Sequence, residues 1–429
     1  MLPSASEADE TRAVLAAAWA GLVAGLRGPT QFLGRHYAGC GATIGAMPRC
    51  DFTCRGCYLG DGANRARPRS VSEVKEQIRA LRAWLGPAGN LQLTDGEVTL
   101  RSETELVELI DYARSIGLVP MLMTHGETFR RKPGLLERLM IGGGLTEVSF
   151  HVDTTMRGRR DHNADATSEA DLHGLRSEFA EMIRRARQCT GRRLEAASTV
   201  TVTRRNLDGV PGIVRWFLSN ADAFKMVSFQ PVAAVGRTDL NLEGVSPDEL
   251  WSRIAEGAGD PALRRGEGWL GHPACSRFVQ GIAVRRPDGA ALVPLYRRDD
   301  EKEMKFLAEL LDRLGGTSFR LDSRAGAARR AAGLLRQHAG FLIARGLPYL
   351  LRLVRRTGTL RARYFCIVSH HFMNAGEIAS PLGQERLSAC AFRVPIDGRL
   401  EPMCAVNALD IRSRFYQSAE RPMPAERAA

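Results

Sequence analysis

The chain has 429 residues, of which 44% are hydrophobic and 25% are charged, and this composition predicts a globular protein of two or more packed units. Its nine cysteines are an odd number at uneven spacings, which excludes a complete disulfide framework. Reduced thiols and metal ligation in a reducing, cytoplasmic compartment are therefore expected.

The N-terminal segment opens with acidic residues at Glu7, Asp9 and Glu10 and continues into an apolar run over residues 14–26. A secretory signal begins with basic residues, and this run is too short to span a bilayer. We therefore expect an amphipathic helix packed on the body of the protein, within a helical extension over residues 1–38.

Strand-like and helix-like segments alternate over residues 39–235. A capping box at Ser70 and Glu73 and a glycine stop at Gly117 mark two of the helices. The six strand-like runs are ATIGAM, NLQLTD, LVPMLMTH, LTEVSFHVD, LEAASTVTVT and FKMVSFQPV. Six β–α units predict an α/β fold with a parallel sheet curled into a partial (β/α)6 barrel, whose chemistry belongs on the loops after the strands.

The pattern changes over residues 236–429, where helices dominate. Two Asp-Gly pairs, at Asp288 and Gly289 and at Asp397 and Gly398, predict small hairpins. We therefore expect a second, mainly helical C-terminal domain carrying small hairpins.

Positive charge is concentrated in one part of this second domain. The net charge of the chain is +12, and residues 324–363 hold ten arginines and no acidic residue, interleaved with apolar runs. Such a stretch can lie on an anionic membrane surface, which would place the protein peripherally on the inner membrane face. A solvated helix face with extended arginines is an equal alternative. RNA binding is less favoured, because the stretch has few aromatic residues to stack on bases.

Three cysteines with C-x3-C-x2-C spacing follow the first predicted strand, at Cys50, Cys54 and Cys57. Thiolates grouped in this way can hold zinc or an iron–sulfur cluster. Zinc would need a fourth ligand, for which His36 and Cys40 are candidates. A [4Fe-4S] cluster held by three cysteines leaves one iron without a protein ligand, free to bind a substrate or cofactor.

This motif after the first strand of a β/α barrel resembles the radical S-adenosylmethionine (radical SAM) superfamily. The resemblance implies that Cys50, Cys54 and Cys57 hold the [4Fe-4S] cluster and that the open iron chelates S-adenosyl-L-methionine. The aromatic residue common before the third cysteine is replaced by Gly56, and Tyr58 follows the motif instead. Tyr58 is therefore expected beside the cofactor.

The segment LTDGEVTL, after the second strand, resembles the GGEP motif that meets the amino group of SAM in this superfamily. Asp95 replaces its first glycine, Gly96 and Glu97 are retained, and Val98 replaces the proline. The resemblance assigns Asp95, Gly96 and Glu97 to cofactor binding. Asp153, after the fourth strand, and Thr199 or Thr201, on the fifth, are further candidate contacts of SAM.

Several longer segments, among them CRGCYLGDG, HPACS and AFRVPIDGRLEPMCAVN, resemble the radical SAM branch that contains tetraether lipid synthase and a related pterin methylase. That branch implies a C-terminal region with an auxiliary iron–sulfur cluster. The candidate ligands of this second cluster are Cys275, Cys366, Cys390 and Cys404, and the alternative is that they are buried core thiols. His370 and His371 are weaker candidates for ligands or substrate contacts, and Cys40 and Cys189 are interpreted as structural.

The resemblance implies an enzyme that reductively cleaves SAM and uses the 5′-deoxyadenosyl radical to abstract hydrogen from an unactivated carbon. An electron donor such as flavodoxin or ferredoxin is implied as a partner. The basic, apolar stretch favours a lipid or another apolar small-molecule substrate, with carbon–carbon coupling or methylation as the outcome. The alternatives are a methylase acting on RNA or a small molecule, and a non-catalytic iron–sulfur protein.

Overall fold

The computed structural model describes residues 5–60, 62–287, 289–320, 323–359 and 363–418. Its centre is a curled sheet in which six parallel strands follow one another in chain order. These strands confirm the six predicted β–α units. They are β1 (Cys40–Ala42), β2 (Asn90–Leu93), β3 (Val119–Thr124), β4 (Glu147–His151), β5 (Glu195–Val202) and β6 (Phe224–Pro231).

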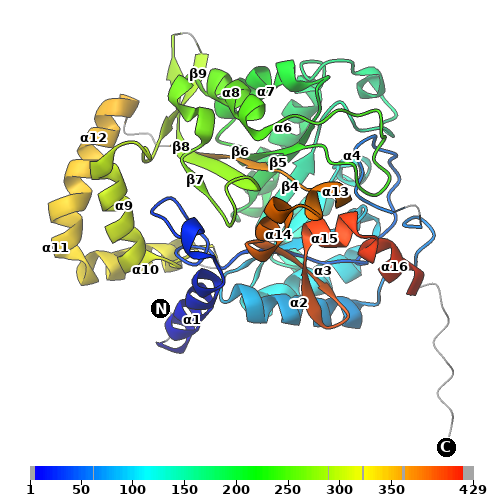
Figure 1. The fold of residues 1–429 in the computed structure, drawn as a ribbon, viewed down its shortest axis with the longest axis horizontal. Coiled ribbons are helices and arrows are strands. Elements are labelled where there is room, and N and C mark those ends of the chain that lie inside the picture. The colour runs from blue at the N-terminus through cyan, green and yellow to red at the C-terminus, as the bar shows by residue number, and fades with distance from the viewer. Residues whose placement is uncertain (1–4, 61, 288, 321–322, 360–362, 419–429) are drawn as a thin grey trace, which may run out of the picture.

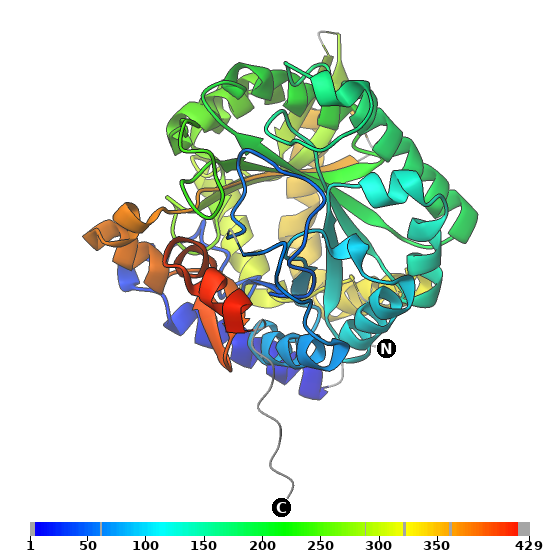
Figure 2. The ribbon, with the colours of Figure 1, turned by 90° about the vertical axis from the view of Figure 1, so that its right-hand side faces the viewer.

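Helices surround this sheet on its outer face, as the end-on view in Figure 2 shows. The predicted capping box is present, because the Ser70 side chain accepts from the Glu73 amide at the start of the first outer helix. That helix buries its apolar stripe of Val74, Ile78, Leu81 and Leu85 against the sheet. The outer helices between the strands are α2 (Val71–Leu85), α3 (Glu103–Ser115), α4 (Glu127–Arg131), α5 (Leu135–Gly142), α6 (His173–Thr190) and α7 (Val210–Ser219).

Strands from the C-terminal half extend both edges of the same sheet. β10 (Arg363–His370) pairs in parallel with β6 and antiparallel with β8 (Ser276–Arg286), which also pairs with β7 (Gly268–Trp269) and β9 (Gly289–Pro294). On the other edge, β11 (Phe392–Ile396) lies parallel to β1 and forms a hairpin with β12 (Arg399–Pro402). The partial barrel is therefore completed by strands from beyond residue 236, and the domain boundaries stay a prediction.

The segment after β7 approaches the segment before β11, and the Gln31 side chain holds it there. Gln31 donates to the Gly271 carbonyl (2.7 Å) and accepts from its amide (3.0 Å). A Cβ placed on Gly271 would lie 2.3 Å from the carbonyl oxygen of Ala389, just before β11. This close approach encloses the lumen of the barrel.

Both predicted hairpins are present as strand pairs. Asp397 and Gly398 have positive φ angles of 46° and 79°, as a type I′ turn between β11 and β12 requires. Strands β8 and β9 pair antiparallel as expected, although Asp288 of their turn lies outside the described residues.

The remaining helices gather at the two ends of the barrel (Figures 1 and 2). At one end lie α13 (Ala375–Ile378), α14 (Pro381–Ser388), α15 (Met403–Ala408) and α16 (Ile411–Ser418). At the other lie α9 (Glu301–Leu314), α10 (Arg324–Gln337), α11 (Ala339–Phe341), the π-helical segment η6 (Leu342–Gly346) and α12 (Leu347–Thr357). Helix α8 (Pro247–Ala258) packs on α7, and short 3-10 helices are η1 (Ala24–Leu26), η2 (Val98–Leu100), η3 (His162–Asp165), η4 (Leu207–Gly209) and η5 (Pro261–Arg265).

The predicted N-terminal helix is α1 (Ala5–Ala20), which packs on the body, but its apolar residues do not form the expected amphipathic stripe. The Leu15 side chain is buried, and Val14 lies against Gly86 at the end of α2. Among the described residues, no helix is both long and apolar enough to cross a membrane.

Candidate active site

The loop that carries the three cysteines crosses the carboxyl end of the barrel after β1 (Figure 2). Backbone hydrogen bonds hold it to neighbouring loops: Thr53 donates to the Arg157 carbonyl (2.8 Å) and Arg55 to the Thr155 carbonyl (2.9 Å). Cys50, Cys54 and Cys57 all line one cavity of about 190 Å³. Among the described residues lining that cavity they are the only cysteines, so three thiols face one cavity without a fourth.

Two hydrogen bonds are directed at the sulfur atoms. The Phe52 amide donates to Cys50 Sγ and the Arg237 guanidinium donates to Cys57 Sγ, both at 3.4 Å. Burial raises the pKa of the Cys50 thiol, and it raises the pKa of Cys54 to about 12. Thiols in this state ionise only when a metal compensates their charge, so metal binding here would release protons. Donors to the sulfurs would then tune the bound group.

The structure does not bring the proposed zinc ligands to these cysteines. His36 and Cys40 line a separate cavity near the amino ends of the strands. Asp51 and His125 lie close to Cys50 instead, but they are paired with each other through His125 Nε2 (2.8 Å), and the His125 ring stacks on Phe52. Three sulfurs around an open space fit a cluster with one free iron better than a closed zinc site.

The segment after β2 packs directly on the cysteine loop. The Gly96 amide donates to the Met47 carbonyl and the Glu97 amide to the Arg49 carbonyl, both at 2.8 Å. The Glu97 carboxylate accepts from Thr124 Oγ1 (2.7 Å) and the His125 amide (2.8 Å). This network fixes Gly96 and Glu97 in the wall of the cavity that the cysteines line.

The Asp95 carboxylate is committed to another contact. It accepts from the Gly45 amide (2.5 Å) and the Tyr416 hydroxyl (2.7 Å), and it forms a buried ion pair with Arg412 of α16. The Tyr58 hydroxyl donates to the Asp95 carbonyl (2.5 Å). Asp95 and Tyr58 both line the cavity, but the Asp95 side chain anchors the C-terminal helix.

The ends of β4 and β5 supply polar groups below the cysteines. Asp153 is buried and does not line the cavity; its carboxylate accepts from the Thr201 amide and from His151 Nε2, both at 2.7 Å. Burial alone would raise the pKa of Asp153, but His151 and these donors lower it to about 2. Asp153 therefore positions His151, which lines the cavity with Thr199 and Thr201.

Sequence reasoning missed several residues that line this cavity. Their signal was their place at the ends of predicted strands: His125 follows β3 and His151 ends β4. The others are Gln92, Met123, Ser149, Met156, Gln230, Phe372, Phe392, Met403 and Asn407.

Three of the four predicted auxiliary cysteines come together. Cys275, Cys390 and Cys404 line a second cavity of about 110 Å³, next to the first, whereas Cys366 on β10 lines the cavity at the amino ends of the strands. Arg386 donates to Cys275 Sγ (3.1 Å), and burial raises the pKa of Cys404 to about 12. His370 and His371 also line this second cavity, while Cys189 is exposed on α6.

Comparisons with known proteins give a family match for part of the chain. Residues 44–201, which include most of the parallel strands, match the Radical SAM superfamily. The chain is similar to 7,8-dihydro-6-hydroxymethylpterin dimethyltransferase of Methanocaldococcus jannaschii, with 24% identity over 208 residues. That match covers 47% of this chain and 38% of the relative, well under two thirds of the relative's length.

Several solved structures are similar to parts of this chain, all at low sequence identity. Streptococcus suis SuiB bound to precursor peptide SuiA has a TM-score of 0.37 and 14% identity, over 51% of this chain and 44% of that one. Native anSMEcpe with bound AdoMet has a TM-score of 0.36 and 13% identity, over 50% and 57% of the two chains. Methylornithine synthase (PylB) has a TM-score of 0.34 and 14% identity, over 61% and 70%.

Proposed function

We propose that this protein is a radical SAM enzyme that abstracts a hydrogen atom from an unactivated carbon of an apolar substrate. The observation that carries the proposal is the meeting of three cysteines with Gly96 and Glu97 around one cavity. When bound, a reduced four-iron cluster and SAM would supply a 5′-deoxyadenosyl radical as the abstracting species.

The residues of the chain have separate roles in this proposal. Cys50, Cys54 and Cys57 hold the cluster, and Arg237 steadies the sulfur of Cys57. The backbone carbonyls at Gly96 and Glu97 would face the ammonium group of SAM, while the Glu97 carboxylate holds this segment in place through Thr124 and His125. His151, Ser149 and Thr199 offer polar contacts deeper in the cavity.

Apolar residues complete the wall and exclude water from the reacting atoms. Met123, Met156, Phe372, Phe392 and Met403 line the same cavity. Exclusion of water protects a reactive species from quenching. This lining supports a lipid or similar apolar substrate over RNA, whose phosphates and bases need polar partners.

We propose an auxiliary cluster at Cys275, Cys390 and Cys404 as well. The three line one cavity, which Cys40 also lines, and Cys366 is left out of the set. The proposal predicts about eight irons per reconstituted chain, since each cluster holds four. Cys404→Ala should lower the count toward about four, while Cys366→Ala, the matched control, should leave it unchanged. A wild-type count near four would refute the second cluster.

The proposed reductant is an acidic one-electron carrier such as flavodoxin or ferredoxin. Arg49, Arg65, Arg67, Arg157 and Arg160 are exposed on and beside the cysteine loop. Their charges would attract an acidic partner to the face nearest the cluster.

The experiment that tests the central proposal is anaerobic. The chain is reconstituted with iron and sulfide, reduced with dithionite and given SAM, and 5′-deoxyadenosine is measured. We expect the product from the wild type and from Cys189→Ala, whose thiol is exposed and remote, but not from Cys54→Ala. A fully loaded cluster that neither binds nor cleaves SAM would favour the non-catalytic iron–sulfur alternative.

The pterin dimethyltransferase similarity makes methylation of a small heterocycle the second candidate function. The substrate distinguishes the two candidate functions. A pterin should stimulate 5′-deoxyadenosine formation by a heterocycle methylase, and an apolar chain should stimulate it by an enzyme that acts on lipids.

A further inference from the structure

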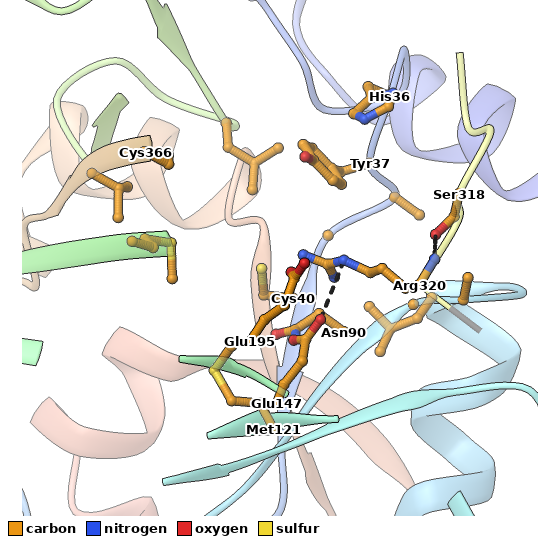
Figure 3. A pocket seen from close by; sticks show the side chains of 18 of the residues that line it. His36, Tyr37, Cys40, Asn90, Met121, Glu147, Glu195, Ser318, Arg320 and Cys366 are labelled. Atoms are coloured by element: carbon orange, nitrogen blue, oxygen red, sulfur yellow. Dashed lines mark hydrogen bonds and ion pairs between the residues drawn. The ribbon is translucent and has the colours of Figure 1, made fainter. Parts of the chain in front are cut away.

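A third cavity, of about 430 Å³, opens at the amino ends of the strands, opposite the cysteine loop. Figure 3 shows Asn90, Glu147 and Glu195, the first residues of β2, β4 and β5, at its floor. Its rim is formed by α1, by residues 36–40 and by residues 316–320, which link α9 to α10. The helices α9–α12 lie at this same end of the molecule (Figure 1). We call this cavity the lower mouth.

Charged groups surround the lower mouth, and cations outnumber carboxylates. Arg320 reaches Glu147 at 3.4 Å, and Arg193 pairs with Glu195 at 2.6 Å. Lys225 adds a further cation to the lining. Among the described residues that line this cavity, three cations face two carboxylates, one of them the deeply buried Glu147, and their sum is a net positive site suited to an anion.

Shared lining residues place the lower mouth in series with the other two cavities. Gln92 lines all three cavities. We call the cavity lined by Cys275, Cys390 and Cys404 the middle cavity. Among the further lining residues that it shares with the lower mouth are Cys40, Met121, Met226 and Leu270. The middle cavity also shares a second set of lining residues with the cavity of the cysteine loop: Met123, Ser149, Thr199, Gln230, Phe372, Phe392 and Met403.

The length of this passage can be estimated along one strand. Glu195 lines the lower mouth and Thr201 lines the radical SAM site, six residues apart on β5. At ~3.3 Å per residue this separation is about 20 Å along the strand. An extended hydrocarbon advances about 1.25 Å per carbon, so about 16 carbons would span it.

The walls between the two ends are mostly apolar and adaptable. Methionine at four positions, Met121, Met123, Met226 and Met403, can adjust to the shape of a flexible chain. The thiols of Cys275, Cys390 and Cys404 belong to segments of the C-terminal half, whereas Met121 and Met226 come from β3 and β6. A chain would therefore run beside the thiol wall rather than through it.

We propose that the substrate enters through the lower mouth as an extended hydrocarbon chain, that Arg193, Lys225 and Arg320 hold its anionic head, and that the chain reaches the cysteine loop past Met121 and Met226. This inference rests on the proposed function for the reaction, but it assigns the route, the head-group site and the chain length independently. A carboxylate and a phosphate share the required anionic chemistry.

The test is calorimetric binding to the reconstituted protein, without SAM or reductant. The probes are palmitate, hexadecyl phosphate, uncharged hexadecanol and the short octanoate. We expect palmitate and hexadecyl phosphate to bind at least about tenfold more tightly than octanoate, because a longer chain buries more apolar surface. The stronger of the two long anions identifies the head group. Equal affinity for octanoate and palmitate would overturn the proposal.

Paired variants at Met226 test the route. Met226→Trp should close the passage and bring palmitate down to the affinity of octanoate, while Met226→Ala keeps the passage open and should retain long-chain binding. Unchanged thermal unfolding and iron content would show that both variants fold. Full palmitate affinity in folded Met226→Trp would overturn the route.

Arg320→Gln tests the head-group site. It should weaken the binding of both anions about tenfold and leave hexadecanol unchanged. An equal loss for hexadecanol would remove the head-group assignment. These binding experiments contain no SAM, so they are independent of the proposed reaction. Binding of long chains without SAM cleavage would support this inference and refute the proposed function. SAM cleavage without preference for long chains would support the proposed function and refute this inference.

Discussion

At the scale of single residues, Gly96 sets the distance between the two motif loops. A Cβ at this position would lie 2.4 Å from the Arg49 carbonyl oxygen and 2.6 Å from that of Pro48, both backbone atoms. Gly96→Ala must therefore push the cysteine loop away from Glu97. A displacement near 1 Å can cost about a hundredfold in rate, so we expect a loss of that order in 5′-deoxyadenosine formation.

The matched control is Gly62→Ala in the same loop, because a Cβ there meets nothing within 4 Å. It should retain activity and SAM affinity, measured by calorimetry. Equal rates for the two alanine variants would contradict the role of Gly96.

Glu267 predicts a pH dependence of stability. Glu267 lies just before β7, and burial of its carboxyl raises the pKa to about 7 from the usual 4.5. The Arg298 amide donates to this carboxyl (2.6 Å) and lowers the pKa, but its effect is smaller than that of burial. An unfolded glutamate loses its proton near pH 4.5, whereas the folded one keeps it to about pH 7. Stability should therefore fall as pH rises through this window, by roughly 3 kcal/mol for about 2.5 pKa units.

The variant Glu267→Gln removes this titration while keeping an acceptor for the Arg298 amide. Urea unfolding should give equal stabilities for variant and wild type at pH 4, and a more stable variant at pH 8. A constant difference across this range would refute the assignment to Glu267.

Two departures from the common radical SAM pattern are explained only by the structure. A Cβ at Gly56 would lie 3.2 Å from Thr201 and 3.3 Å from Val232, so an aromatic ring has no room there. Asp95 replaces a glycine because its carboxylate binds Arg412 and Tyr416, more than three hundred residues later in the chain. The cysteines could be predicted from local spacing, but these contacts depend on distant residues.

At the scale of elements, α16 is attached to the segment after β2 through the Asp95 carboxylate, which pairs with Arg412 and accepts from the Tyr416 hydroxyl. Arg412 and Asp95 are both almost fully buried. Arg412→Met leaves the Asp95 charge without its partner, which typically costs about 3–5 kcal/mol. We expect a loss of this size in urea unfolding and faster amide exchange over α16.

Two further variants isolate this contact. Arg414→Met, in the exposed part of the same helix, should cost little, and the double variant Asp95→Gly with Arg412→Met should recover part of the stability because no buried charge remains. If Arg412→Met and Arg414→Met destabilise equally, the ion pair does not anchor α16.

The central strands could be predicted from sequence because each is a short apolar run between helical repeats. NLQLTD corresponds to β2, and FKMVSFQPV to β6, within two residues. The outer strands could not, because β10 and β11 join the sheet next to β6 and β1, far away in the chain. For the same reason Cys366 was grouped with the other C-terminal thiols, although β10 carries it toward the lower mouth.

At the scale of the whole molecule, the lumen has two ends of different character. The cysteine loop and the helices α13–α16 close one end, and α9–α12 stand beside the other (Figures 1 and 2). The segment through α11, η6 and α12 packs one face on the protein, where Phe306 stacks on Phe341 and Tyr349. Its other face exposes Ile343, Leu347, Leu350 and Leu351, each more than half exposed, at the spacing of one helical stripe.

We propose that this apolar face binds an anionic membrane next to the lower mouth. Arg336, Arg345 and Arg355 are exposed around the leucines, and each cation near an anionic surface contributes about 1 kcal/mol. The protein should sediment with vesicles that contain phosphatidylserine and not with neutral phosphatidylcholine vesicles, and high salt should weaken the binding.

A triple variant, Leu347→Ser, Leu350→Ser and Leu351→Ser, tests the apolar part of this contact. It removes side chains that would each gain about 1.5–3 kcal/mol on burial, so vesicle binding should fall by at least about tenfold while folding is retained. Leu240→Ser is the matched control, because Leu240 is 86% exposed but lies outside α9–α12. If the triple variant sediments with vesicles as well as the wild type, and only high salt weakens binding, the arginines bind the surface without insertion of the leucines. The nearness of the membrane to the lower mouth would then have no role in delivering an apolar chain.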